Sequence, residues 1–309
     1  MQGHPPGLVP RQVATPERTR NLTPVRFRGY GSPVAAKPDA PARHFSQEEH
    51  IVVQDVTKRF GRFTALSNVN LTIHRGHIAV IIGGSGAGKT TLLKVLIGLD
   101  KPTTGKIFVD GQDIVPLGDS AMNRVRRKFG MVFQYSALLD SLSVLENVAF
   151  PLREHTKLRG REIKNRVREK LGVLGLEGIE NRFPSQLSGG MRKRVGLARA
   201  LMLEPEIVMY DEPTSGLDPL SCRMVDELIA ETRDRFGVTS IVISHDMTGA
   251  LQIADHIYML SQGTLVVDAS PTDLVHSGHE LASRFFSASG ISAEELIASR
   301  QAPAGVRYK

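Results

Sequence analysis

The sequence predicts an α/β fold with a mostly parallel β-sheet, an antiparallel β layer beside it and a separate helical lobe. Short apolar runs that predict buried strands alternate with helical patterns, and they read HIAVIIG (77–83), IVMY (207–210) and TSIVIS (239–244). Strands that alternate with helices are typical of parallel sheets. Two strand-like runs at 51–60 and 65–73, with hairpin signals at Asp110-Gly111 and around Gly263, predict the antiparallel pairs.

Helical periodicity accounts for the segments between these strands. One apolar stripe at helical spacing runs through residues 161–174, and another follows Asp218-Pro219, where Asp caps the helix and Pro takes its first position. The segment 135–190 is expected to form the helical lobe. Near the C-terminus, Leu281, Phe285 and Phe286 predict a short amphipathic helix.

Composition excludes several classes of protein. The chain has 309 residues, of which 41% are hydrophobic, as is ordinary for a globular protein. A single cysteine, Cys222, excludes an internal disulfide framework and fits a reducing cytosol. No apolar run reaches the 18 residues of a transmembrane helix, and no secretory signal is evident.

Positive charge is concentrated in residues 1–45, which hold seven Lys and Arg residues against two acidic ones. They also contain eight of the 17 prolines and no hydrophobic periodicity, which predicts a disordered tail. Such a tail either has no function or contacts anionic lipid headgroups. Since five of the seven net positive charges lie there, the rest of the chain gives little support to nucleic-acid binding.

A glycine-rich segment joins the strand 77–83 to a predicted helix. GGSGAGKT (83–90) fits the pattern G-x-x-x-x-G-K-[ST] in the strand–loop–helix context that this pattern requires. Its N–H groups can surround phosphates, Lys89 would reach the β- and γ-phosphates, and Thr90 would ligate Mg²⁺. The predicted nucleotide-binding residues of this segment are Gly83, Gly84, Ser85, Gly86, Ala87, Gly88, Lys89, Thr90 and Thr91.

Polar side chains follow three other predicted strands. Asp211, at the carboxyl end of IVMY, is expected to hold Mg²⁺, and Glu212 to polarise the attacking water as a general base. Gln134 can offer its carbonyl oxygen to Mg²⁺ or to water, and a neutral His245 can donate to a γ-phosphate. Either of these two residues, taken alone, is also an ordinary polar residue at a strand end.

LSGGM (187–191) forms a second anion site at a helix N-terminus. Ser188 is a good N-cap, and Gly189 and Gly190 expose the first N–H groups of the helix that follows. The alternative is that Ser188 only caps the helix and that no anion binds there. Because residues 83–90 already hold one γ-phosphate, the second site makes sense if it faces the nucleotide of another copy.

Together, GGSGAGKT, Gln134, LSGGM, YDEP, SGLD (215–218) and His245 resemble an ATP-binding cassette (ABC) ATPase, a P-loop NTPase fold. This resemblance implies a cassette over residues 46–282, a C-terminal extension over 283–309, and a homodimer of ATPase subunits that binds ATP with Mg²⁺ between its copies. It assigns Phe60, which is otherwise a packing residue, to adenine stacking. Asp211 and Glu212 become the Walker B pair, Asp218 the D-loop residue and His245 the switch histidine.

Met191 stands where the family usually has Gln, and this departure indicates a subfamily. NVAFPLREHT (147–156), LSGGMRKR and the C-terminal RFF resemble ATPases of Mla/MCE-type lipid transporters. The resemblance implies an MlaE-like integral-membrane permease, an MCE-domain lipid-binding protein, and a peripheral position on the cytoplasmic face of the bacterial inner membrane. An importer ATPase for small polar solutes is the alternative, and a soluble ABC ATPase acting on nucleic acid is a third, less favoured one.

Overall fold

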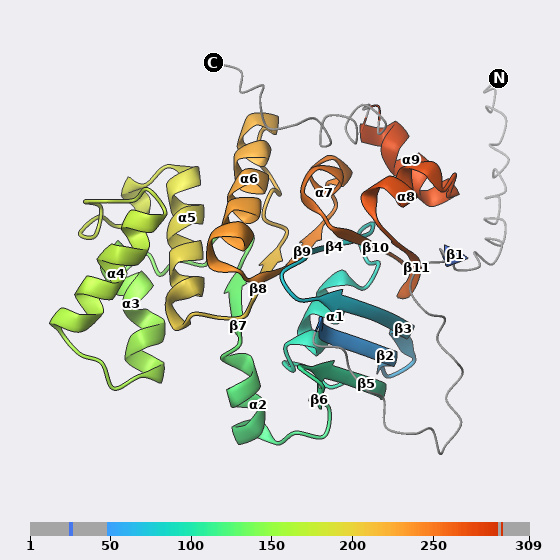
Figure 1. Ribbon diagram of the computed structural model, residues 1–309, viewed down its shortest axis with the longest axis horizontal. Coiled ribbons are helices and arrows are strands. Elements are labelled where there is room, and N and C mark those ends of the chain that lie inside the picture. The colour runs from blue at the N-terminus through green and yellow to red at the C-terminus, as the bar shows by residue number, and fades with distance from the viewer. Residues whose placement is uncertain (1–24, 27–47, 290–291, 293–309) are drawn as a thin grey trace, which may run out of the picture.

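The computed structural model describes residues 25–26, 48–289 and 292 (Figure 1). A seven-stranded sheet lies at the centre, in the order β1-β11-β10-β4-β9-β8-β7. Its bounds are Val25–Arg26 (β1), Ile78–Ile82 (β4), Phe129–Val132 (β7), Ile207–Asp211 (β8), Thr239–Ser244 (β9), His256–Ser261 (β10) and Thr264–Ala269 (β11). All neighbours pair in parallel except β10 and β11, which form the predicted hairpin around Gly263.

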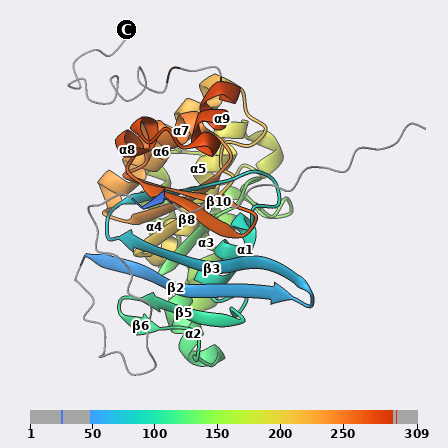
Figure 2. The ribbon, with the colours of Figure 1, turned by 90° about the vertical axis from the view of Figure 1, so that its right-hand side faces the viewer.

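The predicted antiparallel layer is a separate four-stranded sheet in the order β3-β2-β5-β6. It consists of Glu49–Phe60 (β2), Phe63–His74 (β3), Thr104–Val109 (β5) and Gln112–Asp113 (β6). Asp110 and Gly111 both have positive φ, 50° and 74°, as the predicted hairpin turn requires. Figure 2 shows this sheet as a layer beside the central one.

Two hydrophobic cores cover the two faces of the central sheet, since its buried strands point alternate side chains to opposite faces. The core on one face joins Ala79, Ile81 and Met209 to the antiparallel sheet and to α1 (Lys89–Leu96). The core on the other face joins Val80 and Val208 to α6 and α7. Helices on that face are α6 (Pro219–Phe236), α7 (Met247–Ile253), α8 (Pro271–His276) and α9 (Glu280–Ser289).

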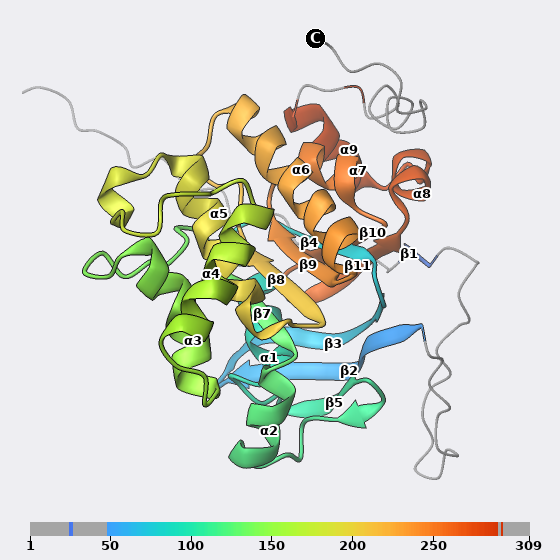
Figure 3. The same ribbon diagram turned by 60° about the vertical axis from the view of Figure 1, so that its left-hand side comes forward.

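The helical lobe lies to one side of the central sheet (Figure 3). It contains α3 (Val144–His155), α4 (Arg161–Val173) and the 3₁₀ turn η1 (Pro184–Gln186), with α2 (Asp119–Arg126) preceding β7. Its core also takes in side chains of α5 (Gly189–Ala200) and η2 (Leu201–Leu203), namely Val195, Ala198 and Met202. The packing of the lobe thus continues past residue 190, the predicted end, because α5 presents one face to it.

The ends of the chain add little to the described structure. From the segment 1–45, only β1 is described, and it pairs with Val267 and Asp268 at the edge of the central sheet. The rest of the predicted tail lies outside the described residues, as do 290–291 and 293–309 of the predicted extension. The amphipathic helix predicted near Phe285 is confirmed as α9, whose Ala282 is buried in the core on this face of the central sheet. Within the described residues, no helix combines the length and apolarity needed to span a bilayer.

Candidate nucleotide-binding site

Residues 83–88 form a tight loop between β4 and α1. A Cβ atom on Gly83 would lie 2.4 Å from the carbonyl oxygen of Leu260, so the loop needs glycine to pack against β10. Gly88 adopts φ 103° at the N-cap of α1. In contrast, a Cβ atom added to Gly84 or Gly86, in the middle of the loop, would meet no atom within 4 Å. The loop is therefore fixed at both ends and open between them, which fits a phosphate.

Lys89 begins α1 with its ammonium group folded toward this loop. Its Nζ donates to the carbonyl oxygen of Gly83 at 2.8 Å and lies 3.4 Å from Oε1 of Glu212. Only 11% of the side chain is exposed. The ammonium group thus faces the predicted phosphate position and the predicted base together.

Glu212 follows directly after β8 in a left-handed backbone conformation, with φ 49°. Such a conformation costs a non-glycine residue roughly 1–3 kcal/mol and is concentrated at functional sites. Its N–H group donates to the carbonyl oxygen of Ile243 at 2.8 Å, which holds the turn against β9. This turn directs the Glu212 carboxylate toward His245, whose Nδ1 lies 2.5 Å from Oε2.

Asp211 ends β8 beside Glu212. Burial, and then the negative charge of Glu212, raise the pKa of the Asp211 carboxyl, while Lys89 and Lys94 oppose the shift. Asp211 and Glu212 bring two carboxyl groups together, and a cation bound there would offset the repulsion between their charges. Thr90 and Gln134 supply the other oxygen atoms of the predicted set, and hydroxyl, amide and carboxylate oxygens are what Mg²⁺ prefers. The residues present therefore fit a magnesium ion.

Gln134 lies just beyond β7, and its Nε2 donates to Oγ of Ser215 at 2.9 Å. The amide carbonyl oxygen is then the atom that can accept or ligate. Ser215 was not among the predicted site residues, although it lies in the SGLD segment. Asp218, in the same segment, caps α6 by accepting from the N–H group of Ser221 at 3.0 Å.

The LSGGM segment opens α5 as predicted. Ser188 caps the helix, and its Oγ accepts from the N–H group of Met191 at 3.3 Å. The N–H groups of Gly189 and Gly190 belong to the first turn, where helix geometry gives no internal acceptor. A Cβ atom on Gly190 would meet nothing within 4 Å, so this helix end is open. Met191 packs against the core of the lobe, which gives a structural use for the departure from Gln.

Phe60 and Cys222 are the remaining residues that the sequence singled out. Phe60 ends β2 with half of its surface exposed and with Nζ of Lys58 at 4.9 Å from its ring centroid. Its strand pairs with β3, whose Ala65 carbonyl oxygen lies against Gly88. Burial raises the pKa of the Cys222 thiol, which fits the prediction that it is no nucleophile.

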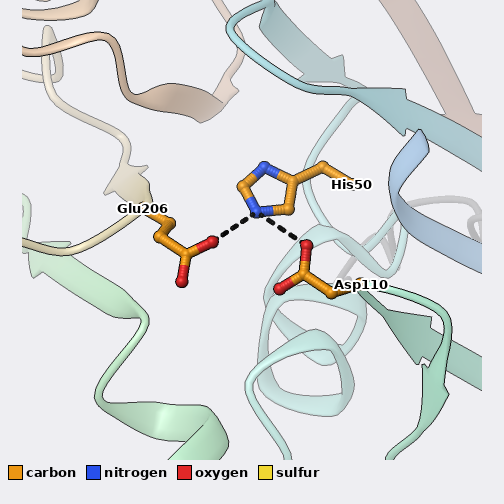
Figure 4. A group of neighbouring side chains, drawn as sticks. All are labelled: His50, Asp110 and Glu206. Carbon is orange, nitrogen blue, oxygen red and sulfur yellow. Dashed lines mark ion pairs between the residues drawn. The ribbon is translucent and has the colours of Figure 1, made fainter. Parts of the chain in front are cut away.

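A separate polar cluster has the composition of a metal site. His50, Asp110 and Glu206 offer three ligand atoms within 4.8 Å of one another, and Nε2 of His50 lies 3.5 Å from Asp110 and 3.6 Å from Glu206 (Figure 4). However, Arg75 and Lys128 each pair with both carboxylates. Their two positive charges already balance the carboxylates, so a divalent cation would be repelled.

We therefore assign this cluster to structure. Nδ1 of His50 lies 2.6 Å from Oγ1 of Thr239 on β9, and NH1 of Arg75 lies 3.2 Å from Nε2. Since Arg75 can only donate, Nε2 accepts and the imidazole is neutral. Burial, and then Arg75, lower the pKa of His50 accordingly. The cluster joins the antiparallel sheet to the amino ends of β8 and β9.

The strand–loop–helix unit, with Lys89 facing an acidic pair at the carboxyl end of a parallel strand, defines a P-loop nucleotide-binding protein. Comparison with known proteins gives the family. The family profile described as ABC transporter matches residues 66–215. The chain is 41% identical over 227 residues to the intermembrane phospholipid transport ATP-binding protein MlaF of Haemophilus influenzae, a match that covers 74% of this chain and 86% of that protein. The chain belongs to the ABC transporter family, as an ATP-binding domain.

Other relatives carry different names. The chain is 42% identical over 231 residues to a probable ribonucleotide transport ATP-binding protein, mkl, of Mycobacterium tuberculosis, covering 75% of this chain and 64% of that protein. It is 40% identical over 240 residues to the Fe(3+) ions import ATP-binding protein FbpC of Escherichia coli O157:H7, covering 78% and 66%. The chain therefore spans about two thirds of these two proteins.

A solved structure confirms the fold. A dimeric ATP-binding cassette described as a post-hydrolysis state bound to ADP and Pi aligns with a TM-score of 0.64 at 36% identity. The alignment covers 71% of this chain and 98% of that one. The predicted fold, a cassette with an antiparallel sheet and a helical lobe, is thus confirmed.

Proposed function

We propose that this chain hydrolyses ATP and powers a bacterial ABC transporter that moves phospholipid or another lipid between membranes. The observation that carries the ATPase proposal is the position of Glu212, held between Nζ of Lys89 and Nδ1 of His245 next to the glycine loop. Support for lipid as cargo comes from the identity with MlaF, which extends over most of that protein's length.

In this proposal, Glu212 is the general base. Its carboxylate accepts the proton of the attacking water, and the hydrogen bond from His245 orients that carboxylate. Lys89 leaves the carbonyl oxygen of Gly83 to contact the β- and γ-phosphates of ATP, and the N–H groups of residues 83–91 surround them. Phe60 stacks on the adenine. Thr90, Gln134 and Asp211 would hold Mg²⁺, which neutralises phosphate charge when it is bound.

The open N-terminus of α5 supports a homodimer. Ser188, Gly189 and Gly190 are exposed, and the N–H groups of the first helical turn have no acceptor within the helix, which makes this end a site suited to a γ-phosphate supplied by a second copy. Two chains arranged head to tail would then enclose two ATP molecules, each between one glycine loop and the partner's α5.

A permease would bind beside Gln134. The segment after β7 exposes the apolar side chains of Phe133, Tyr135 and Leu139, and 83% of the Tyr135 surface is accessible. Exposed apolar groups gathered on one segment mark interaction sites. We place this face against an MlaE-like permease, with an MCE-domain protein as a further partner, at the cytoplasmic face of the inner membrane. No nucleic acid is required.

ATP hydrolysis by the purified chain tests the first part of the proposal. Parent protein should release phosphate from ATP, and Lys89→Ala should neither bind ATP with comparable affinity nor hydrolyse it. Lys164→Ala, on the exposed side of α4, is the matched control and should behave like the parent. Full turnover by Lys89→Ala would refute the assignment of the loop.

The cargo is tested by identifying what the tagged chain binds in native membranes. A permease together with an MCE-domain protein, and lipid extracted with them, would support lipid transport. A solute-binding protein in their place would support the alternative, an importer for small polar solutes, which the similarity to FbpC favours. Purification with ribosomes or nucleic acid, and with no permease, would favour the soluble ABC ATPase.

A further inference from the structure

A cavity opens in the helical lobe where α3 ends and α4 begins. Its volume is about 540 Å³, which lies within the range of about 300–1,000 Å³ that small-molecule sites occupy. Leu158 and Ile163 line it with apolar side chains, and Arg153, Lys157 and Arg159 line it with cationic ones. Figure 1 shows both helices on the far side of α5 from the central sheet. None of the nucleotide-site residues lines this cavity, so it is a separate site.

The three cations that line the cavity are not neutralised from within the described part of the chain. Within residues 48–289, the side chains of Arg153, Lys157 and Arg159 form neither an ion pair nor a hydrogen bond, and no acidic side chain lines the cavity. Hydrogen bonds from Ser143, and more weakly the charge of Arg153, lower the pKa of the Glu146 carboxyl. That carboxylate, however, is engaged by Ser143 at the cap of α3.

Two arginines on α4 that do not line the cavity are each paired with a carboxylate. Arg166 lies 3.5 Å from Glu162 one turn away, and Arg168 lies 3.3 Å from Glu180. Carboxylates are therefore available in this part of the lobe but are not placed at the cavity. Three like charges around one cavity repel one another, and a bound anion would remove that repulsion.

Hydrogen bonds and packing fix the shape of the segment that joins the two helices. Oγ1 of Thr156 donates to the carbonyl oxygen of Leu152 at 2.6 Å and accepts from the N–H group of Leu158 at 3.2 Å. Leu158 packs against the core of the lobe, in which Ile163 is buried. Gly160 turns the chain into α4 with φ 54°, a conformation that glycine adopts without strain. An anion that binds here would not have to order the backbone first, which favours its affinity.

The chemistry of the three side chains indicates which anion fits. A guanidinium group presents a planar fork of donors that binds two phosphate oxygens at once, and an ammonium group adds a point charge. Three cations match a phosphate with two or more negative charges better than they match a single carboxylate. Leu158 and Ile163 would contact an apolar part of the same ligand.

We propose that the cavity between α3 and α4 binds a phosphate-bearing anion through Arg153, Lys157 and Arg159. The phosphate can come from a lipid headgroup at a membrane surface or from a soluble phosphorylated molecule, because the same donors recognise both. Bound ligand would connect the end of α3 with the start of α4. This inference goes beyond the proposed ATP hydrolysis and does not depend on it.

The test replaces the three cations of the cavity together in the full chain. The side chains are exposed and have no hydrogen bond in the described structure, so the variant should fold; it carries Arg153→Gln, Lys157→Gln and Arg159→Gln. A matched control loses the same charge at exposed positions of α4 that do not line the cavity, namely Lys164→Gln, Arg166→Gln and Arg168→Gln.

Inorganic pyrophosphate is the soluble probe. The amide resonances of residues 156–160 report its binding to the cavity, separately from any binding to the glycine loop at 83–90. At low ionic strength, where exposed charges are least screened, we expect saturable shifts at 156–160 in the parent protein. Affinity should be weaker by about tenfold or more in the triple variant and within about twofold of the parent in the control.

Two results would overturn the proposal. One is the absence of shifts at 156–160 in the parent protein, and the other is equal weakening in the triple variant and in the control. If the triple variant does not fold, Arg159→Gln alone takes its place and should weaken binding by about threefold or more.

Sedimentation with vesicles identifies the source of the phosphate. Vesicles of phosphatidylcholine with and without phosphatidylglycerol are compared, and residues 1–45 are present in every variant, so their contribution cancels. If the triple variant loses the binding that depends on phosphatidylglycerol by about fivefold or more and the control keeps it, the ligand is a lipid headgroup. If pyrophosphate binding is lost but vesicle binding does not distinguish the variant from the control, the ligand is a soluble phosphorylated molecule. Either result supports the cavity as an anion site.

Discussion

His245 donates from Nδ1 to Oε2 of Glu212 at 2.5 Å. The sequence predicts that this histidine donates to a γ-phosphate, and in the structure its Nδ1 is paired with the predicted base. The contact depends on the left-handed backbone at Glu212, which turns the carboxylate away from β8. His245 is therefore placed to orient Glu212 before any nucleotide contact is made.

Glu212→Gln tests the role of that carboxylate. Glutamine keeps the shape and can still contact His245 but cannot accept a proton, so ATP hydrolysis should fall by about 10²-fold or more. ATP should remain bound, and the chain should become a stable dimer in size-exclusion chromatography with light scattering. A variant that binds ATP and stays monomeric would contradict the two-copy site.

Ser188→Ala separates the cap of α5 from its proposed contact with a partner's nucleotide. Loss of an N-cap costs a helix about 1 kcal/mol. Ser143, which caps α3 in a capping box with Glu146, supplies the matched control. Both variants should lower thermal stability by similar amounts, but only Ser188→Ala should lose ATP-dependent dimerisation. Equal dimerisation of the two variants would show that Ser188 acts only as a helix cap and does not contact a partner's nucleotide.

Asp226→Asn should alter how stability depends on pH. The carboxyl of Asp226 is buried on α6, and burial, then Asp246 and Glu227, raise its pKa to about 7. The native state therefore holds a proton that the unfolded state loses near pH 4, so stability falls as pH rises from about 4 to 7. Above pH 7 the asparagine variant should be more stable than the parent, by up to about 4 kcal/mol.

The measurement is urea denaturation of both proteins at pH 5 and pH 8. The pKa of His50 is lowered, so the stability that the neutral imidazole contributes is lost as pH falls below 6.5. His50 is present in both proteins, and its contribution therefore cancels in the difference between their free energies of unfolding. A difference between parent and variant that is the same at both pH values would show that Asp226 does not titrate in this range.

Asp110→Asn tests the polar cluster that joins the two sheets. Burial raises the pKa of Asp110, but hydrogen bonds from Lys128 and Arg75 outweigh it and hold the pKa below its ordinary value. Asparagine also tolerates the φ of 50° at this turn, so only the charge is lost. We expect the free energy of unfolding to fall by about 1–2 kcal/mol at pH 7, and this loss to diminish as pH falls below 3.8, the ordinary pKa of the carboxyl. If added Zn²⁺ stabilised the parent protein, the cluster around His50 would instead be a metal site, and its assignment to structure would be wrong.

The strands and most helices were predictable because local patterns specify them. The alternation and turn chemistry of β2, β3 and β5 and the apolar runs of β4, β8 and β9 were confirmed. The helix predicted over 161–174 and the N-cap at Ser188 were also confirmed. The boundary of the lobe was not predictable to the residue. Its core reaches Met202 and not only the predicted end at residue 190, because packing against another helix leaves no local signal in the sequence.

The sequence by itself determined the family, the order of the nucleotide-site segments and the residue types at their centre. It did so because a phosphate loop, a helix cap and an acidic strand end are each local arrangements with fixed spacing. Only the tertiary structure decided that Arg199 reaches a carbonyl 63 positions away, that Lys193 reaches one 20 positions away, and that Arg75 and Lys128 occupy the carboxylates beside His50. Hydrogen bonds to backbone carbonyls place no demand on the residue type at the accepting position, so no sequence pattern records them. The ion pairs of Arg75 and Lys128 with Asp110 join residues 35 and 18 positions apart, a separation at which no local pattern predicts contact.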